Sequence, residues 1–132
     1  MAQAYLNSLG IDGLIVLSSG TVANENRTAN IGPLRDTLLL LERHGIRQYA
    51  KTEPEQLDQS RVDKADVTIL MNEVVRNECE KIATLPDNTI AWDVDDTGEG
   101  SRTLQAGDPD TKYDEDIYAE IKANVDRLIQ SI

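Results

Sequence analysis

The sequence has few of the side chains on which many catalytic and metal sites depend. Its 132 residues include one cysteine, one histidine, one tryptophan and no phenylalanine. A single cysteine excludes an intrachain disulfide and a cysteine-based zinc site within these residues. Because large aromatic side chains are so scarce, we expect a core built mainly from aliphatic residues.

Long apolar runs and positive charge are also scarce. Apolar runs such as Leu38–Leu41 reach only four residues, far fewer than the roughly 20 that a membrane-spanning helix needs. The formal net charge is −11, from 24 acidic and 13 basic side chains. Such a charge disfavours binding to nucleic acid or to an anionic membrane surface. Because no basic and then apolar leader opens the sequence, we expect a cytoplasmic protein.

The acidity is concentrated in the later part of the chain. Residues 1–52 contain 4 acidic and 5 basic side chains, whereas residues 53–132 contain 20 and 8. One interpretation is a solvated surface that keeps the protein soluble. Another is adaptation to high salt, in which carboxylates retain a hydration shell. Unfolding at low salt that molar salt reverses would support the second interpretation.

Short apolar runs bounded by turn residues alternate with helical patterns. Three runs predict buried strands, and the segments around them predict helices. The expected strands are Leu14–Leu17, Val67–Met71 and Thr89–Trp92, and the expected helices are Met1–Leu9, Pro33–His44, Glu53–Ser60, Asn72–Ala83 and Tyr113–Ile132. This alternation predicts one α/β domain over residues 1–132, with a parallel sheet.

The helical patterns also predict their own ends and buried faces. Gly10 and Gly45 are expected to end the helices that precede them, and Thr52 and Asn72 to cap the helices that follow. The expected buried side chains are Leu34, Leu38 and Leu41 of the second helix, Val74, Val75, Cys79 and Ile82 of the fourth, and Ile117, Ile121, Val125, Leu128 and Ile129 of the last.

The lone cysteine and the lone histidine are candidates for catalytic groups. Thiol phosphatases need a cysteine in an anion-binding loop with an arginine six positions later, but Leu85 stands six positions after Cys79. We therefore interpret Cys79 as a small buried hydrophobic residue. His44 falls at a predicted helix end, where a cation is favoured for structural reasons alone, so we do not expect it to be catalytic.

The segment Asp93–Thr97 reads D-x-D-x-T directly after a predicted strand. This is the nucleophile motif of haloacid-dehalogenase-type phosphatases, in which the first Asp attacks phosphorus, the second acts as acid and base, and Mg²⁺ bridges the carboxylates. Asp93 and Asp95 would take these roles. In that family, however, the motif opens the fold. The acidic residues around Asp108–Asp110 lack the pattern of a calcium loop and are expected to be solvated.

Five stretches, taken in order, carry a family resemblance. They are Met1-Ala2-Gln3-Ala4, Ser18-Ser19-Gly20-Thr21 with Ala23, Gly32-Pro33 with Glu42-Arg43-His44-Gly45-Ile46, Ala65-Asp66-Val67-Thr68-Ile69-Leu70-Met71, and Trp92-Asp93-Val94-Asp95-Asp96-Thr97. In this order the chain resembles the low-molecular-weight protein tyrosine phosphatases and the related arsenate reductases. The resemblance implies a three-layer α/β/α fold with a parallel sheet, from which the family's first strand is missing.

The same resemblance implies where the family's functional residues would lie. Asp96 matches the general acid, and Ser18 matches a serine that supports the phosphate loop. The family's nucleophilic cysteine and phosphate-binding arginine belong to a C-x5-R-S-P loop just before the position of Met1, and these 132 residues contain no such loop. We therefore expect an inactive binding or regulatory protein or a truncated gene product. An active phosphatase or arsenate reductase whose true start lies upstream, and an Mg²⁺-dependent aspartyl phosphatase using Asp93 and Asp95, remain as alternatives.

The missing strand also has consequences for partners. In the family it lies between the strands equivalent to residues 14–18 and 67–71, so its loss leaves unpaired backbone groups along two strand edges. A homodimer through these exposed sheet edges is the expected partner interaction. We expect no cofactor, no resident metal ion, no nucleic acid and no membrane as partners, and no binding of small oxyanions.

Overall fold

A computed structural model describes residues 1–21, 31–53, 55–94 and 110–131, and these divide between two compact units. Unit 1 consists of Met1–Leu17, Asn30–Thr52 and Asp95–Ile132, and unit 2 of Ser18–Ala29 and Glu53–Val94. The described elements are helices and a small two-stranded parallel sheet, so the chain belongs to the mixed α/β class.

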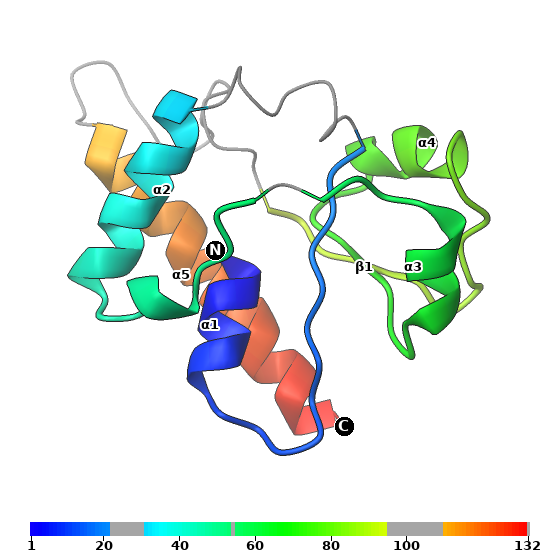
Figure 1. The fold of residues 1–132 in the computed structure, drawn as a ribbon, viewed down its shortest axis with the longest axis horizontal. Coiled ribbons are helices and arrows are strands. Elements are labelled where there is room, and N and C mark those ends of the chain that lie inside the picture. The colour runs from blue at the N-terminus through cyan, green and yellow to red at the C-terminus, as the bar shows by residue number, and fades with distance from the viewer. Residues whose placement is uncertain (22–30, 54, 95–109, 132) are drawn as a thin grey trace. The chain divides into compact units, whose positions relative to one another are not determined.

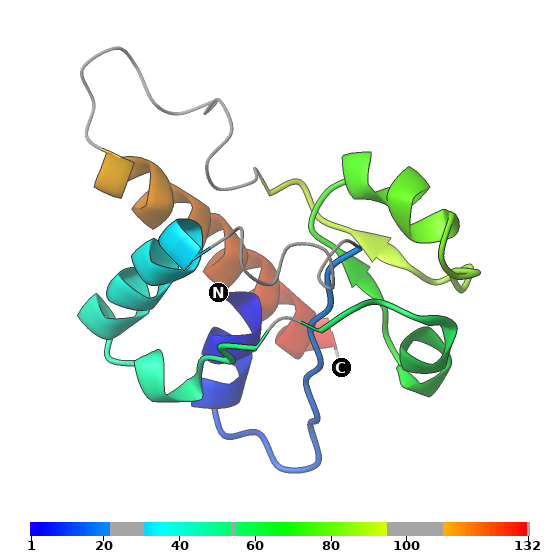
Figure 2. The same cartoon turned by 45° about the horizontal axis from the view of Figure 1, so that its top comes forward.

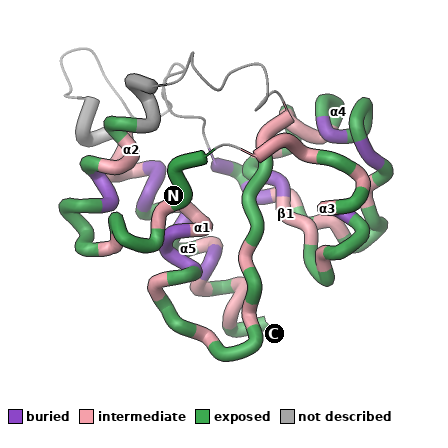
Figure 3. Tube along the Cα trace, in the orientation of Figure 1, coloured by how far each residue is buried: buried purple, intermediate pink, exposed green. Residues whose placement is uncertain are grey.

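Unit 1 is helical. Its elements are α1 (Ala2–Ser8), α2 (Ile31–Arg43), the short 3₁₀ helix η1 (Arg47–Tyr49) and α5 (Asp110–Ser131) (Figure 1). The three α-helices direct their buried positions toward one core, which Figure 3 shows in purple. Its buried side chains are Ala4, Tyr5, Leu6, Leu40, Leu41, Ile117, Tyr118, Ile121 and Val125. As the sequence predicts, this core is largely aliphatic.

Glycines end two helices of unit 1 where the sequence predicts that they should. Gly10 and Gly45 have positive φ angles of 60° and 73°, which side chains with a Cβ rarely adopt. After α2, the amide of Gly45 donates to the carbonyl of Glu42 and that of Ile46 to Leu41. The last carbonyl groups of α2 are therefore satisfied by a turn that glycine allows.

Unit 2 holds the parallel sheet. Its elements are α3 (Gln59–Lys64), β1 (Ile69–Leu70), α4 (Val74–Glu80) and β2 (Ile90–Ala91), with Ile69 opposite Ile90 and Leu70 opposite Ala91 (Figure 2). The expected parallel sheet is present, and it is formed by parts of the second and third apolar runs. The buried side chains of the unit are Val62, Leu70, Cys79, Ala83, Trp92 and Val94.

The prediction of a buried strand at Leu14–Leu17 is wrong. The segment forms no strand, and Ile15 and Leu17 are 86% and 51% exposed. An apolar run becomes a strand only where a second backbone accepts its hydrogen bonds, and among the described residues none pairs with it. The other two runs do form strands, but each is only two residues long.

Two helix predictions in unit 2 also need correction. The predicted helix Glu53–Ser60 is wrong, because Gln56 instead forms a parallel bridge with Gly20. The helix of this region starts later, where Asp58 accepts a hydrogen bond of 2.8 Å from the amide of Arg61.

The fourth predicted helix is shorter than expected. It ends at Glu80 instead of Ala83. Val74 is its first residue and is 82% exposed, and Ile82, which lies beyond its end, is 38% exposed. The predicted burial of these two side chains is therefore wrong, whereas the predicted burial of Cys79 is confirmed.

Candidate functional site

The carboxyl ends of β1 and β2 form the first part of a candidate site. The amide of Val94, after β2, donates to the carbonyl of Met71, after β1, at 2.9 Å. The side-chain amide of Asn72 donates to the carbonyl of Val94 at 3.0 Å, and its oxygen accepts from the amide of Val75 at 3.3 Å. Asn72 therefore joins the end of β2 to the start of α4. In open α/β sheets, ligands bind at this edge.

The predicted acidic residues begin at this edge. Asp93 is exposed and directly follows the buried Trp92. Asp95 and Asp96, predicted as the second Asp of the D-x-D-x-T motif and as the general acid, lie outside the described residues. The structure therefore gives the position of one of the three candidate carboxylates.

Ser18, the predicted loop-support residue, lies in a second cluster of unit 2, around the guanidinium group of Arg61. Arg61 donates from Nε to Ser19 Oγ at 2.6 Å and from Nη2 to the carbonyl of Ser18 at 3.1 Å. It also forms an ion pair with the carboxylate of Glu55. One arginine thus connects the segment that begins at Ser18 to the segment around Glu55.

Backbone hydrogen bonds hold the same two segments together. The amide of Gly20 donates to the carbonyl of Glu55 at 2.9 Å, and the amide of Leu57 donates to the carbonyl of Gly20 at 3.0 Å. The sequence alone does not point to Arg61, because its hydrogen bonds to Ser18 and Ser19 span more than 40 positions. Because Arg61 already contacts Ser18, Ser19 and Glu55, its role is to hold these segments together, and we do not assign it as an anion-binding group.

Cys79 has no environment that favours a nucleophile. It is 6% exposed, and burial raises the pKa of its thiol, with a smaller opposing effect from Arg76. A reactive cysteine needs the opposite change, because the thiolate is the nucleophile. The burial of Cys79 agrees with its interpretation as a core residue.

His44 takes part in a structural contact with α5. Its Nε2 lies 2.6 Å from Glu115, and its ring lies against Tyr118 with ring centroids 4.2 Å apart. Burial alone would raise the pKa of Glu115, but hydrogen bonds from His44 and Arg43 outweigh it and lower the pKa of Glu115. The side chain of His44 therefore contributes to the packing of the end of α2 against α5.

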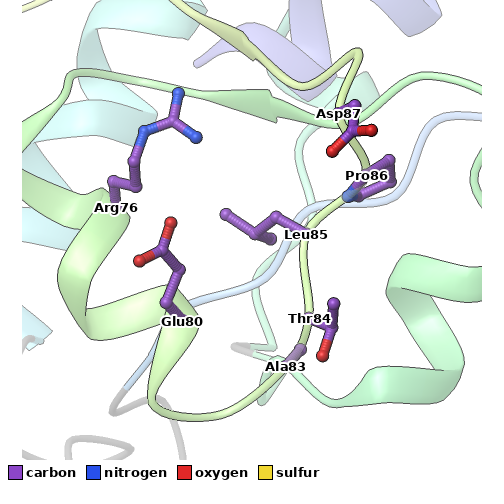
Figure 4. Close-up of a pocket in the computed structure, with 7 residues that line it drawn as sticks. All are labelled: Arg76, Glu80, Ala83, Thr84, Leu85, Pro86 and Asp87. Atoms are coloured by element: carbon purple, nitrogen blue, oxygen red, sulfur yellow. The ribbon is translucent and has the colours of Figure 1, made fainter.

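A shallow pocket of about 410 Å³ lies beside α4 in unit 2. Figure 4 shows Arg76 and Glu80 extending from α4 on one side, with Leu85, Pro86 and Asp87 on the other. Both Nε and Nη2 of Arg76 already donate to the Glu73 carboxylate, at 2.7 and 3.1 Å. Because two further carboxylates line the pocket, an anion such as phosphate is disfavoured there.

No family model, curated protein or solved structure matches this chain. In the described part of the chain, no helix is long and apolar enough to cross a membrane. Among those same residues, no group of three or more His, Cys, Asp and Glu side chains could hold a metal ion.

Proposed function

We propose that this chain is a low-molecular-weight tyrosine phosphatase-like protein that binds or regulates and does not catalyse. Its fold would be the family's three-layer α/β/α arrangement without the first strand. The observation that carries the proposal is the parallel pairing of β1 with β2. β1 lies within one of the five resembling stretches, and β2 ends directly before another. The segment that leads to Asp96 starts at the carboxyl edge, beside Asn72. The general acid of the family would act from such an edge.

The chemistry of these 132 residues argues against catalysis. Transfer of a phosphoryl group through cysteine needs a thiolate and a set of donors for the phosphoryl oxygens. Cys79 is buried, with a raised pKa, and no arginine stands six positions after it. A general acid alone contributes only about 10²–10⁴-fold to a rate. Asp96 without a nucleophile therefore leaves the polypeptide inactive.

A gain-of-activity experiment tests this proposal. The 132-residue chain is compared with an extended chain that carries a β-strand and a C-x5-R-S-P loop directly before Met1. We expect no hydrolysis of p-nitrophenyl phosphate by the original chain and measurable hydrolysis by the extended chain. Asp96→Asn in the extended chain should lower the rate by about 10²–10⁴-fold, because it removes the proton donor to the leaving oxygen.

The outcomes of this experiment distinguish the proposed non-catalytic protein from the alternatives. A folded extended chain that remains inactive would contradict the proposed scaffold. Activity of the unextended chain that survives purification would contradict the proposed lack of catalysis. If an open reading frame upstream of Met1 encodes such a loop, the extended chain is the natural phosphatase or arsenate reductase.

A second candidate function is an Mg²⁺-dependent aspartyl phosphatase. The observation that favours it is the exposed position of Asp93 two residues after β2, at the carboxyl edge of the sheet. In the same assay, this candidate requires activity of the unextended chain that depends on Mg²⁺ and disappears in Asp93→Asn. Asp66→Asn, at another exposed aspartate, is the matched control.

A further inference from the structure

Residues 14–17 have the side-chain pattern of a strand although no strand pairs with them. Leu14 and Val16 are half-buried, whereas Ile15 and Leu17 are exposed. Burial that alternates at every second residue is the signature of an extended β conformation. The exposed positions carry large apolar side chains, and Ile15 at 86% is the most exposed large hydrophobic residue in the described part of the chain.

The two backbone edges of this segment also differ in the hydrogen bonds that they make. On one edge, the amide of Leu14 donates to the carbonyl of Ile11, and the carbonyl of Val16 accepts from Gln3 Nε2 at 3.0 Å. In an extended chain, the N–H and C=O groups of the odd-numbered neighbours point to the opposite edge. There, the backbone groups of Ile15 and Leu17 make no hydrogen bond to any described residue. The segment is thus anchored along one edge and open along the other.

We propose that the open edge of residues 14–17 pairs antiparallel with the same segment of a second copy of this chain. A two-fold axis would pass beside Val16, so that Val16 of each copy faces Val16 of the other. Ile15 of one copy and Leu17 of the other would then form a hydrogen-bonded pair, in which the N–H of each residue donates to the C=O of the other. The contact is self-complementary, as a two-fold interface requires.

The charge distribution favours a second copy as the occupant of this edge. Two molecules with a net charge of −11 repel one another over most of their surfaces. Residues 13–24 carry no charged side chain, and Asp12 is the only charged side chain among residues 1–24. The side chains of residues 13–24 therefore add no like-charge repulsion of their own to a contact between two copies. The exposed Ile15 and Leu17 side chains would become cross-strand apolar neighbours.

The first test measures association in solution, and it does not depend on the proposed function. Sedimentation velocity of the full chain should show a concentration-dependent rise toward twice the 14.6 kDa of one copy. Ile15→Asp should raise the dissociation constant by about tenfold or more, because it places a charge in an apolar strand contact. Val74→Asp adds the same charge at a residue that is 82% exposed, and it should leave association unchanged.

The second test measures the register of the pair. In a Cys79→Ala background, Val16→Cys should form an intermolecular disulfide rapidly, because directly opposed residues have Cβ atoms about 4.5–5.5 Å apart. Ile15→Cys should cross-link more slowly, although Ile15 is far more exposed, because it faces Leu17 of the second copy. Circular dichroism of each variant establishes that the chain is folded.

Four outcomes would overturn the proposal. The first three are a monomer at millimolar concentration in molar salt, equal effects of Ile15→Asp and Val74→Asp, and faster cross-linking at Ile15 than at Val16. The fourth is growth beyond a dimer, because it would require a head-to-tail contact that does not close on itself.

Discussion

At the scale of single residues, Tyr5 shows how α1 is tied to α5. Its hydroxyl donates to Asp126 Oδ1 at 2.7 Å, and its ring packs edge-on against Tyr118 with centroids 6.2 Å apart. Burial raises the pKa of Tyr5 to about 12, and the hydrogen bond to Asp126 acts in the same direction. The neutral hydroxyl is therefore the form that stabilises the helix contact.

The raised pKa of Tyr5 predicts how stability changes at high pH. Because the folded pKa lies above the ordinary value of 10.0, the stabilisation is fully present below pH 10 and is lost as the pH rises toward 12. Ultraviolet titration of tyrosinate should show a late-titrating group that Tyr5→Phe removes. The free energy of unfolding of Tyr5→Phe should also fall less steeply over this interval. Burial also raises the pKa of Tyr118, so the test compares the number of late-titrating groups in the two proteins. If Tyr5→Phe has as many of them as the original chain, the assignment to Tyr5 is wrong.

Leu40 and Leu41 show which buried side chains of α2 a helical pattern can and cannot predict. The predicted stripe of α2 included Leu41, which is 1% exposed, but it omitted Leu40, which is fully buried. A single stripe at 3.6-residue spacing leaves out a helix face that packs against two neighbours. Contacts of α2 with both η1 and α5 explain why the buried face is wider than the stripe.

At the scale of elements, Asn72 connects a helix to a strand. Its side-chain oxygen accepts from the amide of Val75 in the first turn of α4, and its side-chain nitrogen donates to the carbonyl of Val94 after β2. The cap position of α4 is Glu73, so the prediction of Asn72 as the cap residue is wrong by one position, although Asn72 does accept from an amide of the first turn. The bond to Val94 is an additional role that local sequence signals do not reveal, because it spans 22 positions.

Two substitutions at Asn72 separate these roles. Asn72→Ala removes both, and we expect the free energy of unfolding to fall by about 1–3 kcal/mol. Asn72→Asp keeps the acceptor at the helix N-terminus and loses only the donor, so the expected loss is smaller, about 1 kcal/mol. Chemical denaturation measures both values.

The matched control for these variants is Asn88→Ala, at an exposed asparagine of the same unit. Its free energy of unfolding should stay within about 0.5 kcal/mol of the original chain. Equal losses in Asn72→Ala and Asn88→Ala would show that the connection through Asn72 does not stabilise the fold.

At the scale of the whole molecule, negative charge dominates the electrostatics. The net charge is −11, and the ion pairs of the described residues, such as Arg43 with Glu115 and Arg47 with Glu42, are partly exposed. Exposed ion pairs contribute only about 0–1 kcal/mol each. The general repulsion among carboxylates should therefore outweigh the attraction within these pairs.

Salt should accordingly stabilise the protein. Raising the ionic strength from about 0.1 M to about 1 M shortens the screening length from about 10 to about 3 Å, which weakens the long-range repulsion most. We expect the melting temperature, followed by circular dichroism, to rise with sodium chloride. The double variant Asp66→Asn and Asp87→Asn, at two exposed aspartates, should melt higher at low salt and gain less from added salt. A melting temperature that falls with salt would mean that ion pairs dominate.

Features that depend on neighbours along the chain can be predicted from the sequence alone. The glycines at the ends of α1 and α2 could be predicted from conformational freedom, and the buried Ile117, Ile121 and Val125 of α5 from helical periodicity. The presence of a parallel sheet followed from the alternation of apolar runs with helices. In the candidate site, the D-x-D-x-T pattern marked the segment after β2, whereas Ser18 was implied only by the family resemblance.

Which apolar runs pair with another strand depends on the tertiary structure. Leu14–Leu17 has the same composition as a buried strand, yet Ile15 and Leu17 are exposed, because a strand is completed by hydrogen bonds to another backbone. The hydrogen bonds from Arg61 to Ser18 and Ser19 likewise join segments that are distant in sequence. Periodicity and capping reflect interactions within a few residues, whereas strand pairing and long-range hydrogen bonds depend on which distant segments the fold brings together.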